Sequence, residues 1–79
     1  MTNTEKYRDT FAAAFEADKE KVTGFVYQDT PEWDSIAHMM LMSGLEDAFG
    51  IELEPEDMLA VTSYAAGIEV LAKKGIVFE

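Results

Sequence analysis

The 79-residue sequence has no cysteine and only one histidine, and each shortage excludes a class of protein. Without cysteine, neither a disulfide framework nor a cysteine-ligated metal can hold the fold. The apolar stretches are far shorter than the roughly 18 residues that span a bilayer, and residues 1–5 lack the charged-then-apolar pattern of a secretion signal. We therefore expect a cytoplasmic protein without a membrane segment.

Basic residues are also scarce. Sixteen acids against six bases give a formal net charge of −10. Such a surface repels phosphate backbones and anionic lipids, which argues against binding to nucleic acids or membranes, and it attracts basic protein surfaces. A solubilising coat of acids would give the same composition, so the charge alone does not distinguish a docking surface from a merely soluble one.

The length of the chain indicates one domain over residues 1–79. Hydrophobic residues make up 48% of the sequence, which is typical of a globular rather than a disordered chain. Ordering a residue costs roughly 1.5 kcal/mol, so a chain this short needs nearly all its apolar burial for folding. A deep, preorganised catalytic cleft is therefore not expected.

Hydrophobic spacing predicts an all-α fold, a small bundle of three main helices and a short one. The expected helices run over residues 4–18, from 34 or 35 to 49, over 56–60, and from 62 or 63 to 75. The first carries its apolar side chains at three- and four-residue spacing: Tyr7, Phe11, Ala14 and Phe15. The last carries a similar stripe: Tyr64, Ile68, Leu71 and Ala72.

Local signals set the expected helix ends. Gly50 and Gly75 suit left-handed C-terminal caps, with Ile76 folding back on the last helix, and Pro55 suits a first helical position. A long irregular connection is expected over residues 21–32. Its apolar members should pin it against the core: Val22, Phe25, Val26 and Tyr27. Residues 75–78 are ambiguous between coil and strand.

The helix from 35 to 49 is apolar on two faces in its first half. At 100° per residue, one face is the natural core side and holds Leu41, Met42, Leu45 and Phe49. The opposite face holds Ile36, Met39 and Met40, with Glu46 and Asp47 further along. Exposed Met and Ile beside acids indicate a surface that adapts to several partners. The alternative is that the connection over 21–32 covers them.

The side chains that catalysis requires are nearly absent. His38 is the single histidine, and the sequence has no nucleophile-elbow or phosphate-loop glycine pattern. The acids do not follow the spacing of a calcium loop. We therefore expect neither enzymatic activity from this chain alone nor a metal site.

Ser35 lies where the connection meets the second helix, directly after Asp34. Asp-Ser before an apolar helical run is a good helix start, and most such serines only cap the helix. A hydroxyl at a helix N-terminus is also exposed and well placed to carry a phosphodiester anion. Ser43, in mid-helix, and Ser63, the expected cap of the last helix, are weaker candidates for modification.

The sequence from Asp34 onward resembles the acyl carrier protein and peptidyl carrier protein family. That family shows Asp-Ser-Leu or Asp-Ser-Ile, an apolar helix, an acidic pair, Phe-Gly-Ile and a short acidic segment. The matching residues here are Asp34-Ser35-Ile36, Leu41, Leu45 and Glu46-Asp47, then Phe49-Gly50-Ile51-Glu52-Leu53, Glu56-Asp57 and Thr62-Ser63. The resemblance covers about residues 33–71 and is weaker over the first helix.

The resemblance implies that a phosphopantetheinyl transferase attaches 4′-phosphopantetheine from coenzyme A to Ser35, in the motif that begins at Asp34. The thiol of this arm would hold an acyl or aminoacyl group as a thioester, and the chain, expected to be a monomer, would present it to acyl-activating or acyl-transferring enzymes. Tethering raises the effective concentration of the cargo at each enzyme. Basic patches on these partners would meet a docking face made of Ile36, Met39, Met40, Glu46 and Asp47. His38 is expected to be a neutral histidine at the edge of the core, or else to contact the arm.

Three positions depart from the family pattern. The family commonly has glycine two residues before the serine, where this chain has Trp33, and fatty-acid-type members often carry acids where this chain has Ala37 and Met40. These departures favour a dedicated pathway over bulk fatty acid synthesis. A polyketide or other secondary-metabolite carrier, a polysaccharide-modification carrier and an aminoacyl carrier all remain open. The alternative function is an unmodified acidic helical module that binds partners through the same Ile36, Met39 and Met40 surface.

Overall fold

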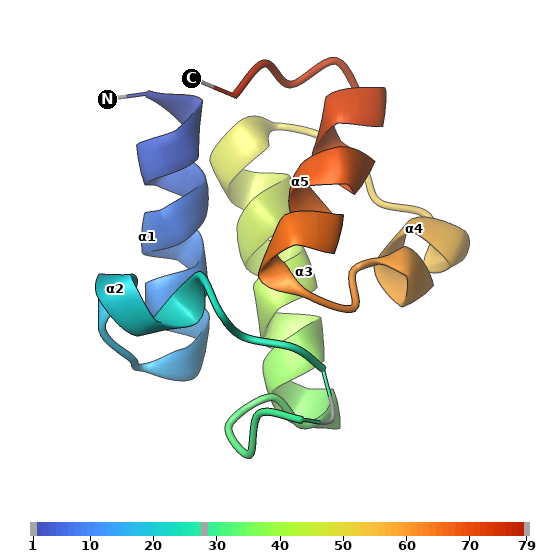
Figure 1. Ribbon diagram of the computed structural model, residues 1–79. Helices are drawn as coiled ribbons and strands as arrows, with labels where there is room; N and C mark the ends of the chain where they lie inside the picture. The colour runs from blue at the N-terminus through green and yellow to red at the C-terminus, as the bar shows by residue number, and fades with distance from the viewer. Residues whose placement is uncertain (1, 28, 79) are drawn as a thin grey trace.

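The computed structural model describes residues 2–27 and 29–78; residue 28, in the predicted connection, and both terminal residues lie outside this part of the chain. Five helices follow one another, with no strand in the described ranges: α1 (Asn3–Phe15), α2 (Lys19–Val22), α3 (Ser35–Phe49), α4 (Pro55–Ala60) and α5 (Tyr64–Lys73). Figure 1 shows α1 beside α3, α5 across α3, and α4 at the margin next to α5. The prediction of a helical fold is therefore confirmed.

The first helix ends three residues before its predicted end. Thr2 caps it through a capping box with Glu5, and Glu16 closes it in the left-handed conformation at φ 51°. The chain then forms α2, a one-turn helix that the sequence prediction missed, and Lys19 Nζ lies 2.9 Å from Asp9 Oδ1. The irregular connection consequently begins after Val22.

Six of the fifteen buried core residues in the described ranges are aromatic. Tyr7, Phe11 and Phe15 are buried along α1, and the rings of Phe11 and Phe15 lie 5.6 and 5.2 Å from the ring of Trp33. The predicted stripe of α1 is thus correct except that Ala14 is only half-buried. Val22, at the end of α2, and Phe25, in the connection, pack into the core as expected, and Tyr27 packs at its edge.

One member of the connection does not pack as predicted. Val26 is exposed, because it lies in an isolated antiparallel bridge to Ser63 rather than in the core. The backbone N–H of Tyr27 donates to the Thr62 carbonyl at 2.9 Å, and that of Tyr64 donates to the Phe25 carbonyl at 3.1 Å. The connection is therefore held to the start of α5 by backbone hydrogen bonds.

The third helix has the predicted bounds. Gly50 caps it in the left-handed conformation at φ 63°, and the N–H groups of Gly50 and Ile51 both donate to the Glu46 carbonyl. Leu41, Met42 and Leu45 are buried as expected. Phe49 is half-buried and packs against the core.

The last two helices differ in how they are anchored. In α5, Ser63 Oγ accepts from the Ala66 N–H at 3.0 Å, and Ile76 N–H donates back to the Leu71 carbonyl past Gly75, as predicted. The apolar face of α5 includes Gly67 and Val70, whereas Ala72, predicted to belong to it, is exposed. The buried face of α5 therefore runs through Tyr64, Gly67, Val70 and Leu71, and Ala72 lies outside it.

By contrast, α4 contributes no buried residue. Its connection to the end of α5 is polar, because Lys74 Nζ lies 2.7 Å from Asp57 Oδ2. This hydrogen bond lowers the pKa of Asp57 and raises that of Lys74. Along residues 2–27 and 29–78, none of the helices combines the length and apolar character that crossing a membrane requires.

Candidate functional site

Ser35 is the first residue of α3, and its side chain is exposed. Asp34, in an extended conformation, precedes it and caps the helix: Asp34 Oδ1 accepts from the Ala37 N–H at 2.8 Å. The cap is therefore the aspartate and not the serine. The Ser35 hydroxyl has no hydrogen-bond partner among the residues that the structure describes, so the purely capping role considered for it does not apply.

Trp33 fixes the chain just before the serine. Its side chain is 2% exposed and packs edge-on to Phe11 at a centroid distance of 5.6 Å. The backbone N–H of Trp33 donates to the Thr30 carbonyl at 3.0 Å. Trp33 therefore holds the chain that leads to Ser35 against the core.

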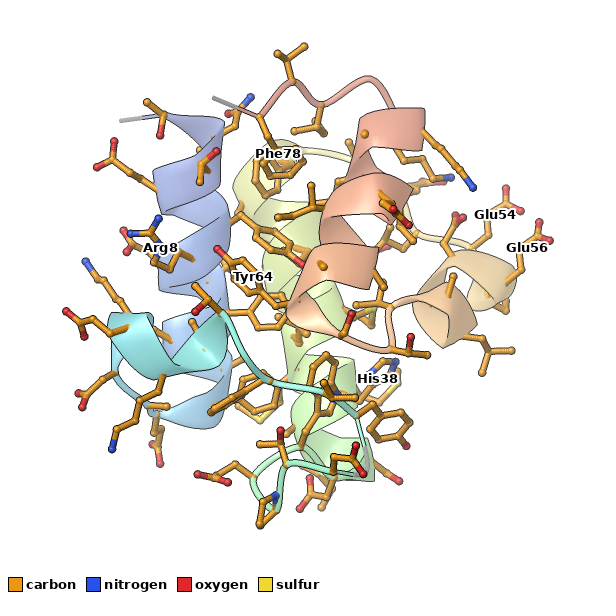
Figure 2. The ribbon with its side chains drawn as sticks, in the orientation of Figure 1. Arg8, His38, Glu54, Glu56, Tyr64 and Phe78 are labelled. Atoms are coloured by element: carbon orange, nitrogen blue, oxygen red, sulfur yellow. The ribbon has the colours of Figure 1, made fainter. Side chains whose placement is uncertain are left out.

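His38 joins three segments of the chain. Figure 2 shows its side chain between α3 and α4. The indole Nε1–H of Trp33 donates to His38 Nδ1 at 2.9 Å, and His38 Nε2 lies 2.9 Å from the Met58 carbonyl oxygen of α4. An indole only donates and a carbonyl only accepts, so the imidazole must be the neutral Nε2–H tautomer. The Tyr27 ring stacks on it at 5.0 Å and 17°.

This geometry agrees with a neutral histidine at the edge of the core. Both ring nitrogens are occupied, so His38 has no free nitrogen for proton transfer or for a metal. Nor do histidine, aspartate and glutamate side chains gather into a metal-binding group of three anywhere in the described ranges. The second idea for His38, contact with an attached arm, stays a prediction.

The outward face of α3 is open rather than covered by the connection. Ile36, Met39 and Met40 are 73%, 58% and 57% exposed. Asp47 is exposed on the same helix. Four of the five predicted docking residues therefore share an accessible surface that begins next to Ser35.

Glu46 and Ala37 lie elsewhere than the sequence suggested. Glu46 is half-buried, and its Oε2 accepts from the Leu53 N–H at 2.8 Å, which holds the segment that follows α3. Ala37 is 9% exposed and belongs to the core. The absence of an acid at position 37 is therefore explained by burial, because an unpaired carboxylate there would lose its hydration.

The histidine network is the part of the site that the sequence did not predict. Trp33 and His38 are five residues apart across a helix start, a spacing that no periodic pattern links. Met58 contributes a backbone carbonyl, which carries no signal in the side-chain sequence. The one hint in the sequence was a bulky aromatic residue where the carrier family that the sequence resembles commonly has glycine.

Comparison of the sequence with models of known protein families and with curated proteins finds no match.

Proposed function

We propose that this chain is a carrier protein that holds acyl or aminoacyl groups as thioesters on a 4′-phosphopantetheine arm attached to Ser35. The observation that carries the proposal is the hydroxyl of Ser35, which is exposed at the start of α3 while Asp34 does the capping. A serine needed for the fold would have its hydroxyl engaged. Here no residue that the structure describes engages the hydroxyl.

The surroundings of Ser35 suit a phosphodiester. No hydrogen bond from the backbone N–H of Ser35 or Ile36 reaches any described residue, so both can face an anion at the positive end of the 15-residue helix. The Asp34 carboxylate partly offsets this, but its Oδ1 is turned to the Ala37 N–H.

During attachment, the Ser35 hydroxyl would attack the β-phosphorus of coenzyme A and form a new P–O bond. The pyrophosphate P–O bond breaks, adenosine 3′,5′-bisphosphate leaves, and the hydroxyl proton passes to a base on the transferase. Once attached, the arm supplies a thiol, which this cysteine-free chain does not have. The chain itself positions the arm and performs no catalysis.

The charge and the outward face of α3 fit the partners that a carrier requires. A net charge of −10 attracts basic surfaces and speeds encounter with them. Ile36, Met39 and Met40 offer adaptable apolar contacts next to the attachment point. These features support docking to a transferase and to acyl-activating or acyl-transferring enzymes of a dedicated pathway.

Mass spectrometry tests the proposal directly. Incubated with coenzyme A, magnesium and a broad-specificity phosphopantetheinyl transferase, the protein should gain the mass of one phosphopantetheine. Ser35→Ala should gain none, whereas Ser43→Ala, a matched change at another exposed serine of α3, should be loaded normally. An unchanged mass with several transferases, or label on Ser43, would contradict the carrier function.

The exposed apolar face of α3 also fits a second function, that of an unmodified acidic module which binds basic partners. The two functions share a docking face and differ only at Ser35. Failure of loading together with retained partner binding would favour this second function.

A further inference from the structure

Two adjoining hollows lie between α1 and α3. Their volumes are about 540 and 390 Å³, and Ala13, Ala14 and Met40 line both of them. Together they form a trough, the α1/α3 groove, that runs from Ile36 near the start of α3 to Ala48 near its end. At a rise of about 1.5 Å per residue, this length of α3 is roughly 18 Å.

Small side chains produce the groove. At Gly44, a β-carbon would meet Thr10 Cγ2 at 3.1 Å, so this is a point of close approach between α1 and α3. Thr10 is itself held, because its hydroxyl donates to the Lys6 carbonyl at 2.8 Å. On the outer side of this contact, Ala13 and Ala14 are too short to fill the space beside Met40.

The opposite side of α3 is closed by hydrogen bonds. His38 Nε2 is bound to the Met58 carbonyl, and Glu46 Oε2 is bound to the Leu53 N–H. An approaching apolar side chain would have to break these contacts on the α4 side. On the α1 side it would enter existing space.

Acids dominate the rim of the groove. Five acids line it, against one base: Asp9, Glu16, Glu32, Asp34 and Asp47, against Lys6. Lys6 Nζ lies 5.2 Å from the centre of the Phe49 ring, and Lys19 pairs with Asp9. Most of the rim is therefore negative.

This charge restricts what can occupy the groove. A second copy of the chain would bring another net charge of −10, and an anionic lipid or nucleic acid would also be repelled. The apolar lining requires apolar side chains from the occupant, and the rim requires positive ones. Both requirements are met by an amphipathic basic helix.

We propose that the α1/α3 groove docks a basic amphipathic helix of a partner protein, with apolar side chains between Ala13 and Met40 and Lys or Arg against Asp47. The inference rests on the proposed function, because the partner is an enzyme that attaches the arm to Ser35 or acts on the group that the arm carries. It adds α1 to a docking surface that the sequence placed on α3 alone. The exposed Ile36 and Met40 form the end of this surface nearest the attachment point.

The test uses a synthetic 18-residue helical peptide with leucines at i, i+3, i+4 and i+7 spacing and lysines elsewhere. It is titrated into the unmodified, isotope-labelled protein and followed by amide NMR shifts. Salt near 150 mM limits unspecific attraction between distant charges. The largest shifts should fall on Ala13, Ala14, Gly44 and Ala48.

Matched variants assign the binding to the groove. Ala13→Arg should weaken peptide binding at least fivefold, whereas Ala65→Arg, at an exposed alanine of α5, should not change it. Asp47→Asn should weaken binding about two- to fivefold, as expected for one exposed charge pair, and Glu69→Gln on α5 less than that.

Shifts spread evenly over the surface, or centred on α4 and α5, would overturn the proposal. So would equal losses in the groove variants and their α5 controls. Because the titration uses protein without an arm, and can be repeated with Ser35→Ala, its failure is distinct from a failure of loading.

Discussion

The contact between Gly67 and Tyr7 gives a sharp test of the packing of α5 against α1. Gly67 is buried in α5, and a β-carbon placed there would collide with the hydroxyl of Tyr7. That hydroxyl is fully buried and donates to the Tyr64 carbonyl at 2.7 Å. We predict that Gly67→Ala destabilises the protein and that Tyr7→Phe relieves much of the effect.

The expected magnitude follows from opposing terms. In an unobstructed helix interior, Gly→Ala would stabilise by about 1 kcal/mol. Here the methyl group must displace the phenol, at an overpacking cost of about 1–3 kcal/mol, and break its hydrogen bond, at about 1 kcal/mol. The net loss should be about 1–3 kcal/mol. In the Tyr7→Phe background the nearest atoms, Tyr7 Cζ and Val61 Cγ1, lie 3.2 Å away, so a small shift suffices.

A double-mutant cycle measures this coupling. Urea unfolding followed by the fluorescence of Trp33, the single tryptophan, gives the free energy of unfolding for the four proteins. We expect a favourable coupling of about 1–2 kcal/mol. Gly44→Ala, where only the Thr10 methyl is close, should cost less than Gly67→Ala. Additive effects, within about 0.5 kcal/mol, would refute the reasoning.

Four further predictions follow from single features of the structure. Asp34→Ala removes the N-cap of α3 and should lower the free energy of unfolding by about 1 kcal/mol in urea. Burial raises the pKa of the Tyr7 phenol, so its contribution to the free energy of unfolding should be complete below pH about 10, where the phenol of the unfolded chain begins to ionise, and should fall at higher pH. Urea titrations should show that Tyr7→Phe loses less stability at alkaline pH than the wild type. The melting temperature should rise from low to moderate ionic strength, because 16 acids face 6 bases, and a flat response would mean that the acids are already compensated. Met40→Glu should shift loading, in competition with the wild type, toward a fatty-acid-type acyltransferase and away from the cognate enzyme, by a factor of several. Equal rates for both proteins with both enzymes would contradict this. Adding Ala37→Asp would not extend the test, because position 37 is buried.

The parts of the fold that local chemistry determines could be predicted from the sequence. Both ends of α3 were predictable, because Asp34 is a strong N-cap and Gly50 adopts the left-handed conformation at low cost. Pro55 and Ser63 similarly marked the starts of α4 and α5. In each case a single residue type decides the boundary.

Features that depend on tertiary contacts could not be predicted from the sequence. The first helix ends at Phe15 and is capped by Glu16 in the left-handed conformation. Glutamate rarely adopts this conformation, so its residue type does not mark the end of the helix. The burial of Ala37 depends on how closely α1 approaches α3. The role of Glu46 depends on where the backbone of Leu53 returns.

The candidate site shows the same division. Ser35 was chosen as the candidate from its neighbours in sequence. The reason that its hydroxyl has no partner in residues 2–27 and 29–78 is geometric, since the carboxylate of Asp34 caps the helix. The outward direction of Ile36 and Met40 follows from helical periodicity. The groove beside them does not, because it depends on the distance between two helices.

Trp33 stands where the carrier family that the sequence resembles commonly has glycine, and this difference has a structural consequence next to Ser35. A glycine before Asp34-Ser35 would leave the backbone there conformationally free. Trp33 instead packs against Phe11 of α1 and donates to His38, which in turn binds the Met58 carbonyl of α4. Three helices are thereby connected within a few residues of Ser35, and the serine takes no part in the connections. If Ser35 carries the proposed arm, these contacts would hold the base of the arm in place, so the flexibility needed to visit partners would come from the arm itself rather than from the loop that precedes it.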